Sequence, residues 1–411
     1  MRNISLPEML LGPFIDLEAR ARGPLYARGV EQYWIAFADV HAPRFALQRS
    51  LPAGFRAQFL REVGLTDYLV ADPRELVARF RNARWSAICD ALDAWPELTS
   101  KRQCRLVMLL HALCFYELIA SRIPKWFETK IRMDSDSAEL AFRAASARYA
   151  LGLPGRVAEF STADMSEFEA VLALAQPDDP VAFNAAVKVF VHKAKVGAPV
   201  NELMGWQIRS EQALQTVIAK SNNFTSDLLL SRFYRAAAFV PQRQGNRDEV
   251  VRIMDRSEHH ALAMKPASDA EALLYLENLH PVLESRTKEA LWLGDLNLAL
   301  ARALRVTELD PYDSKGWCEV GQVRLKRKEY LEAAQAYAAA ALLGPPASAI
   351  GRYMAGLCFR DLGQPLLAAF FNKAASEVDP LAISPHDEIQ CLPDEPILIA
   401  LKEWSLRSFQ S

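Results

Sequence analysis

The sequence has few cysteines, little net charge and no long uninterrupted apolar run, and each shortage excludes a class of protein. Its 6 cysteines in 411 residues include no CxxC pair. Neither a disulfide framework nor a zinc site is therefore predicted, and the spacing fits a reducing compartment. The net charge of −2 argues against a general nucleic-acid binder, which needs a basic surface. The most apolar run, Leu106 to Ala120, is shorter than the roughly 20 residues that span a bilayer.

The sequence also lacks the common signatures of catalysis. It contains no P-loop, GxGxxG, HExxH or GxSxG motif and no kinase signature. It has no convincing stretch of alternating apolar and polar residues, which would indicate a half-buried strand. Apolar residues instead recur at spacings of three to five, and Pro or Gly separates the segments. We therefore expect an all-α, cytoplasmic protein without a cofactor and without a nucleic-acid or membrane partner.

One pattern occurs three times between residues 280 and 382. A turn residue, Gly294, Lys328 or Gly363, is followed five residues later by an alanine and then, twelve residues further on, by a proline. The copies are 34 and then 35 residues apart. A fixed period of this length predicts a stacked helical repeat.

The middle copy is the clearest of the three. It contains Trp317, Gly321, Ala333, Tyr337 and Pro345 at the corresponding offsets. This arrangement resembles the tetratricopeptide repeat (TPR) family, in which two antiparallel helices cross closely at the small residues. The large aromatic side chains would fill the space beside that crossing, and the proline would start the next unit.

The resemblance implies a right-handed solenoid of helical hairpins. We expect a helical N-terminal region over 1–267, made of irregular repeats or forming a separate helical domain. TPR-like repeats follow over 268–382. An acidic loop and a C-terminal capping helix, in which Asp394 begins a helix to Phe409, complete the chain over 383–411.

The resemblance also implies where a ligand binds, because the first helix of each TPR hairpin lines a concave groove. The groove positions with side chains suited to binding are Glu284, Lys288, Trp292, Lys315, Gln322, Lys326, Tyr353 and Arg360. The mixture of cationic and aromatic side chains suits a peptide that carries carboxylates. Cys318 and Gln322 stand where family members with a carboxylate clamp have Lys and Asn, so a dedicated clamp is not expected.

Glu277, His280 and Glu284 would share one helix face, as in half of a di-iron carboxylate site. The sequence contains no second copy of this motif, so a surface or capping cluster is favoured and no metal is predicted.

Two further groups of polar residues are open to a structural and a functional interpretation. Lys188, His192 and Lys195 share a helix face that would meet solvent or an anionic ligand. His111 and Glu117 lie within an apolar helix, where Glu117 would pair with an arginine such as Arg148 or Arg122, or contribute to an active site.

The leading hypothesis is a non-catalytic scaffold that holds a protein or peptide in its concave face. The alternative is an enzyme whose helical N-terminal domain modifies a peptide or carrier-bound substrate presented by the repeats. A third possibility is a regulator whose curvature changes when a peptide binds.

Overall fold

The computed structural model describes residues 91–112, 119–120, 122–123, 133–152, 164–309, 313–342 and 348–378. This part of the chain consists of helices and the turns between them and contains no strand, which confirms the expected all-α class. The chain divides into two compact units, with the boundary between Glu289 and Ala290 inside one long helix. Unit 1 and unit 2 are therefore described separately.

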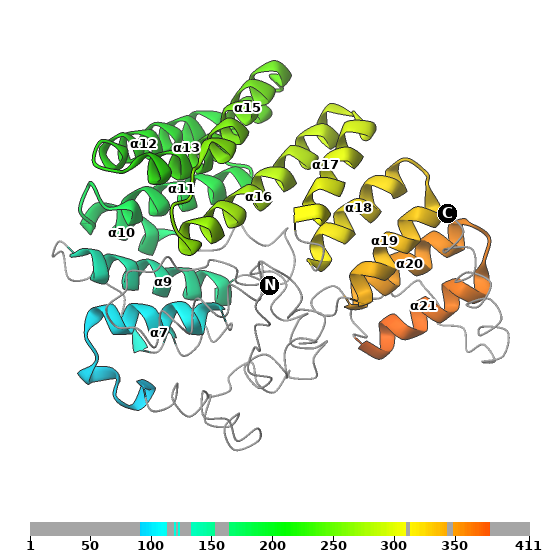
Figure 1. Cartoon of the computed structure of the whole chain (residues 1–411), viewed down its shortest axis with the longest axis horizontal. Coiled ribbons are helices and arrows are strands. Elements are labelled where there is room, and N and C mark those ends of the chain that lie inside the picture. The colour runs from blue at the N-terminus through cyan, green and yellow to red at the C-terminus, as the bar shows by residue number, and fades with distance from the viewer. Residues whose placement is uncertain are drawn as a thin grey trace. The chain divides into compact units, whose positions relative to one another are not determined.

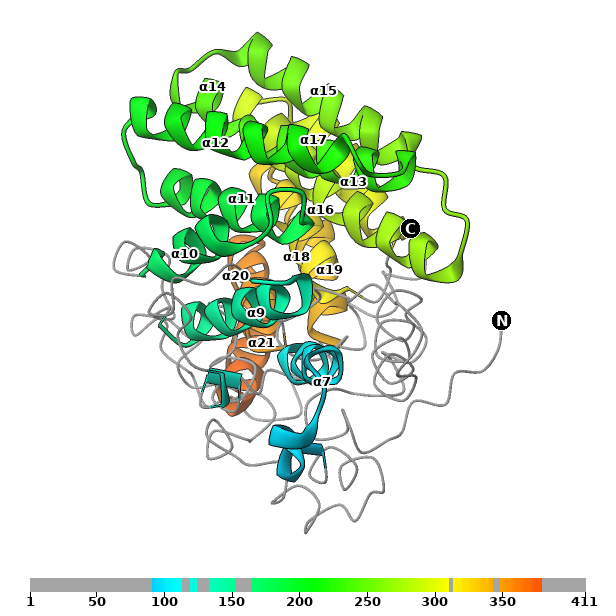
Figure 2. The ribbon, with the colours of Figure 1, turned by 90° about the vertical axis from the view of Figure 1, so that its left-hand side faces the viewer.

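Unit 1 consists of helices that pack against their neighbours along the chain, as Figures 1 and 2 show. Its elements are the 3₁₀ helix η3 (Trp95–Glu97), α7 (Ser100–Ala112), α9 (Ser135–Gly152), α10 (Ser166–Leu174), α11 (Pro180–Lys195), α12 (Val200–Ile218), α13 (Asn223–Ala237), α14 (Phe239–Arg243), α15 (Arg247–Ala263) and most of α16 (Asp269–Leu293). The array of packed helices thus begins well before residue 280.

Side-chain caps mark where two of these helices, α11 and α13, begin. The Asp179 carboxylate accepts a hydrogen bond from the Val181 backbone N–H at 2.8 Å, and Pro180 occupies the first turn of α11. Asn222 caps α13 by accepting from the Thr225 N–H at 2.8 Å. These caps fix the register of α11 and α13, the two helices that carry the charged groups discussed below.

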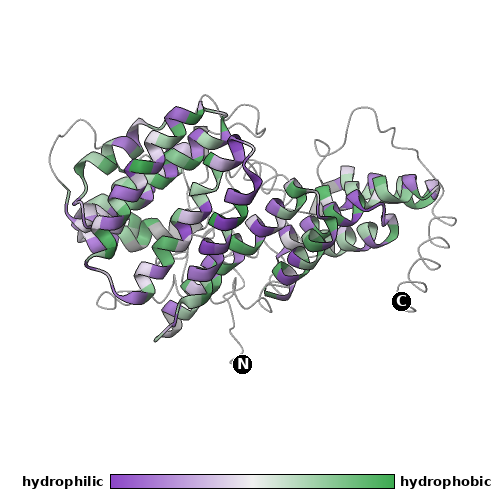
Figure 3. Ribbon diagram, turned by 90° about the horizontal axis from the view of Figure 1, so that it is seen from above, coloured by the Kyte–Doolittle hydropathy of each residue, from purple (hydrophilic) through white to green (hydrophobic). Residues whose placement is uncertain are grey.

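The core of unit 1 forms where aromatic and aliphatic side chains meet between α9, α10, α11 and α12. Phe168 and Phe190 are almost completely buried, and the edge of the Phe142 ring packs on Phe168 with 5.6 Å between centroids. Trp206 closes the same cluster from α12. Figure 3 shows the corresponding stripes of apolar and polar residues along the helices.

Unit 2 is a row of antiparallel helices formed by the end of α16, α17 (Leu296–Leu309), α18 (Ser314–Lys326), α19 (Tyr330–Leu342), α20 (Ser348–Asp361) and α21 (Pro365–Val378). The three predicted turn residues have left-handed backbone, with φ of 86° at Gly294, 63° at Lys328 and 70° at Gly363. The alanines five residues later are buried. The predicted period is therefore present in the backbone as well as in the sequence.

The predicted close crossing lies between α18 and α19. A Cβ atom added to Gly321 would lie 2.9 Å from the Tyr337 ring, which is nearer than side chains can approach. The same pairing recurs one repeat later, where Gly356 of α20 meets Asn372 of α21. Gly351 adds a contact that the motif does not predict, since its Cβ would lie 2.7 Å from the Tyr337 carbonyl oxygen.

Several expectations fall on residues outside the described part. These are the prolines of the three repeats, Pro311, Pro345 and Pro380, and the loop and capping helix expected over 383–411. The expected division at 267/268 also stays a prediction. Among the described helices, none is both long enough and apolar enough to cross a membrane.

Replacing Lys328 with glycine is expected to stabilise the protein by about 0.5–1 kcal/mol, because a side chain in the left-handed region is strained and glycine is not. The free energy of unfolding in urea measures the effect. The control is Ala301→Gly in α17, which should lower that free energy by about 1 kcal/mol. If Lys328→Gly destabilises the protein as Ala301→Gly does, the backbone at residue 328 is not left-handed.

Replacing Gly321 with leucine is expected to lower the free energy of unfolding by about 1–3 kcal/mol through overlap with the Tyr337 ring. Gly205 of α12 provides a matched control, because a Cβ there meets nothing within 4 Å. Gly205→Leu should leave stability unchanged or raise it slightly, since leucine favours helix. Equal effects of the two substitutions in urea unfolding would contradict the close crossing.

Candidate functional site

The predicted groove residues of unit 2 that lie on α18 share one helix face. Lys315, Gln322 and Lys326 are all exposed, and their spacing of seven and then four residues places them on one side of the helix. On α20, Tyr353 is half-buried and Arg360 is exposed. Both helices pack against α19. α18 and α20 are each the first helix of a helical hairpin, and we call them first-of-pair helices. Unit 2 therefore presents cationic side chains and part of a tyrosine ring from these two helices.

The remaining predicted groove residues lie on α16. Trp292 is half-buried in the part of α16 that belongs to unit 2, and Lys288 is exposed in the part that belongs to unit 1. Glu284 is only 8% exposed, and its Oε1 atom lies 3.6 Å from Nδ1 of His280. Glu284 thus has a buried partner within unit 1, whereas Lys288 faces solvent.

The three residues considered as metal ligands, Glu277, His280 and Glu284, do not place all their ligand atoms close together. The ligand atoms of Glu277, His280 and Glu284 are not all within 4.8 Å of one another, although His280 and Glu284 form a pair. The charge on Glu277 acts on Arg232 of α13. His280 and Glu284 are buried, so these two residues do not form a surface cluster.

The stripe Lys188, His192, Lys195 has one exposed member. Lys195 is exposed, whereas His192 is 4% exposed and its Nδ1 lies 3.0 Å from the Tyr149 hydroxyl. The Lys188 Nζ atom lies over the Tyr149 ring, 4.5 Å from its centroid. Burial, together with the nearby charge of Lys195, lowers the pKa of Lys188 to about 8. The interpretation of a solvent-exposed stripe is therefore wrong for His192 and incomplete for Lys188.

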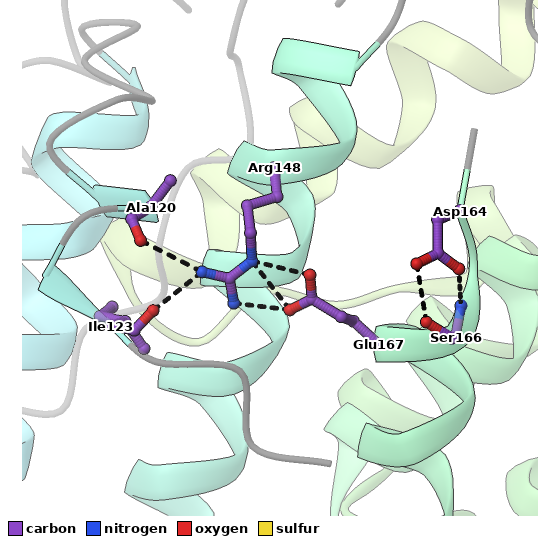
Figure 4. Close-up of polar contacts among 6 residues, drawn as sticks. All are labelled: Ala120, Ile123, Arg148, Asp164, Ser166 and Glu167. Atoms are coloured by element: carbon purple, nitrogen blue, oxygen red, sulfur yellow. Dashed lines mark hydrogen bonds and ion pairs between the residues drawn. The ribbon is translucent and has the colours of Figure 1, made fainter. Parts of the chain in front are cut away.

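Arg148 has a structural role that Figure 4 shows. Its guanidinium donates to the Glu167 carboxylate through Nε at 2.7 Å, and through Nη1 to the Ile123 carbonyl oxygen at 2.8 Å. This ion pair joins α9 to α10, and the carbonyl bond joins α9 to the segment before it. The Arg148 guanidinium therefore forms its ion pair with Glu167. Glu117 and the side chain of His111 lie outside the residues that the structure describes.

Two arginines of α13 belong to a charged cluster that no sequence motif indicates. Arg232 and Arg235 are three residues apart on one face of the helix and are half-buried. Burial lowers the pKa of Arg232 to about 10, with Arg235 adding to the effect and Glu277 opposing it. Burial also lowers the pKa of Arg235, against the opposing charge of Glu284. In the sequence, this cluster is marked only by two arginines three residues apart in the segment that forms α13.

Comparison with known proteins gives neither a family nor a curated relative, since no family model and no curated sequence match this chain. Similar solved structures include YrrB, described as a TPR protein with an unusual peptide-binding site. It is 17% identical, with 48% of this chain and 93% of that chain covered and a TM-score of 0.31. Human IFIT1, in a dimer with PPP-AAAA, is 12% identical. That match covers 99% of this chain and 87% of the IFIT1 chain, with a TM-score of 0.31. Because these scores are low, the fold class rests on the helix packing described above.

Lys188→Met is expected to stabilise the protein at about pH 7, because methionine keeps the contact with Tyr149 and removes a charge that burial disfavours. The pKa of Lys188 in the folded protein is about 8, below the ordinary value of 10.5. Between pH 8 and pH 10.5, residue 188 is therefore protonated more often in the unfolded chain than in the folded protein. Stability should therefore rise with pH across this interval, and the variant should lack this contribution. Urea unfolding at several pH values measures it, with exposed Lys373→Met as control. An unchanged pH dependence in Lys188→Met would contradict the burial of this amine.

Proposed function

We propose that this protein is a non-catalytic scaffold that binds an acid-bearing peptide or protein segment through the first-of-pair helices of unit 2. The observation that carries the proposal is the shared face of Lys315, Gln322 and Lys326 on α18. All three side chains reach solvent from a helix whose opposite side is anchored against α19. A rigid helix face with exposed polar groups can hold a ligand without rearranging its own backbone.

The chemistry of this face favours a ligand with carboxylates and an extended or helical backbone. Lys326 and Arg360 offer positive charges for carboxylates, and the Gln322 amide can donate to or accept from a peptide group. The half-buried rings of Trp292 and Tyr353 offer apolar surface at low conformational cost. Such a surface would fix the orientation of a ligand mainly by charge and shape.

A catalytic function receives less support from the described residues. The candidates for chemistry from the sequence are His280 with its neighbouring carboxylates and, separately, His111 and Glu117. His280 is 6% exposed and lies next to Glu284, which suits a structural polar cluster. The enzyme alternative would gain support from a metal or chromophore that copurifies in stoichiometric amount.

Reversing charges on the proposed face should abolish peptide binding without unfolding the protein. The test is selection of binders from a random peptide library, with the wild type expected to enrich acidic sequences. The variant Lys315→Glu/Lys326→Glu/Arg360→Glu should enrich none of them, and its circular dichroism should remain helical.

Lys373→Glu, on the exposed side of α21, is the matched control for a charge reversal outside the proposed face. It should select the same acidic peptides as the wild type. Equal enrichment by the triple variant, or loss of enrichment in Lys373→Glu alone, would remove the α18 and α20 face from consideration.

A further inference from the structure

We infer that unit 1 contains a covalent binding site for a small apolar aldehyde or ketone, in which the amine of Lys188 forms a Schiff base with the carbonyl carbon. Lys188 lies on α11, and its side chain reaches toward α9 and α10. Its Nζ atom is 4.5 Å from the centroid of the Tyr149 ring and 5.9 Å from that of the Phe168 ring. Lysines held against apolar groups in this way are suited to react with carbonyl compounds.

The amine of Lys188 is surrounded by aromatic rings and has no counter-ion among the described residues. The Tyr149 and Phe168 rings meet edge to face, with 6.1 Å between their centroids, so they form one apolar surface beside Nζ. Within the described part of the chain, Lys188 forms no ion pair and no hydrogen bond. The residue is half-buried, which leaves part of the side chain open to small solutes. The site therefore suits a small molecule with an apolar skeleton and one reactive carbonyl group.

A phenol and an imidazole that can transfer protons belong to the same cluster. The Tyr149 hydroxyl lies 3.0 Å from Nδ1 of His192, which stands one turn after Lys188 on the same face of α11. Burial and the neighbouring lysines lower the pKa of His192, so its ring is mostly neutral near pH 7. A neutral imidazole in hydrogen-bond contact with a phenol can accept a proton and pass it on.

The low pKa of Lys188 supports this assignment, because only an uncharged amine has the lone pair that attacks a carbonyl carbon. Burial, with the charge of Lys195, brings this pKa from 10.5 to about 8. At pH 8, about half of the Lys188 amines are therefore uncharged, against less than about 1% for an ordinary lysine. The site is independent of the proposed peptide face, because Lys188 belongs to unit 1 and α18 and α20 belong to unit 2.

The reaction needs no oxidant or reductant. The nitrogen lone pair forms a bond to the carbonyl carbon, and the carbonyl oxygen takes up one of the two amine protons, which gives a carbinolamine. The C–O bond of the carbinolamine then breaks, and the oxygen leaves as water with the second amine proton. Tyr149 and His192 carry these protons from nitrogen to oxygen. Hydrolysis reverses the sequence, so the adduct is reversible.

Reductive trapping tests the inference on the full-length protein. Propionaldehyde is added at pH 8 with sodium cyanoborohydride, which converts an imine into a stable secondary amine, and peptide mass spectrometry measures labelling at each lysine. Lys188 should be labelled about tenfold or more faster than the exposed Lys265 and Lys373, because more of its amine is uncharged. This preference should shrink as the pH rises toward 10.5. If Lys188 is labelled no faster than the two exposed lysines at pH 8, the inference is wrong.

The variant Tyr149→Phe distinguishes a role in proton transfer from packing, because it keeps the ring beside Nζ and removes the hydroxyl. Labelling of Lys188 by propionaldehyde should slow about tenfold, the low end of what a lost proton-transfer group costs. Labelling of Lys373 in the same sample should not change. An unchanged rate at Lys188 would contradict the role of Tyr149.

A charged aldehyde tests the class of ligand. Glyoxylate carries a carboxylate, and placing that charge against the Tyr149 and Phe168 rings is costly. The labelling of Lys188 relative to Lys373 should therefore be weaker with glyoxylate than with propionaldehyde. A stronger relative labelling by glyoxylate would overturn the assignment to an apolar carbonyl compound.

Discussion

The close crossing of antiparallel helices is the constraint on which the rest of unit 2 depends. Gly321 lets the Tyr337 ring lie directly on α18, and the left-handed turn at Lys328 returns the chain at the angle that this contact requires. Because Gly321 has no side chain, α18 and α19 approach closely, and their outward faces are held rigidly. The orientation of Lys315, Gln322 and Lys326 toward solvent follows from this packing. A ligand surface can therefore be built on α18 without any loop.

Charged residues are used differently in the two units. In unit 1 two largely buried arginines join helices: Arg148 joins α9 to α10 through Glu167, and Arg286 joins α16 to α15 through Asp255 at 2.6 Å. Such pairs hold helices together, because separating them would leave buried charges without partners. In unit 2 the cations on α18 reach solvent, where a ligand would meet them.

The fold was largely predictable from the sequence, whereas the candidate sites were only partly so. The turn residues and small residues of the repeats are local signals, since Gly294 and Gly363 need left-handed backbone and Gly321 needs space. Helix ends are equally local: at the start of α16, the Ser268 hydroxyl accepts a hydrogen bond from the nearby Glu271 N–H at 3.2 Å. The burial of His192 and the enclosure of Arg232 depend on which helices face each other. No spacing rule supplies that information.

The central claim, that peptides bind along α18 and α20, is tested most directly by hydrogen–deuterium exchange with an acidic peptide selected on the wild type. Binding should slow amide exchange in α18 and α20 more than in α19 and α21, because the ligand contacts only the first-of-pair helices. Protection confined to α19 and α21, or to unit 1 alone, would contradict the account and place the ligand on another surface.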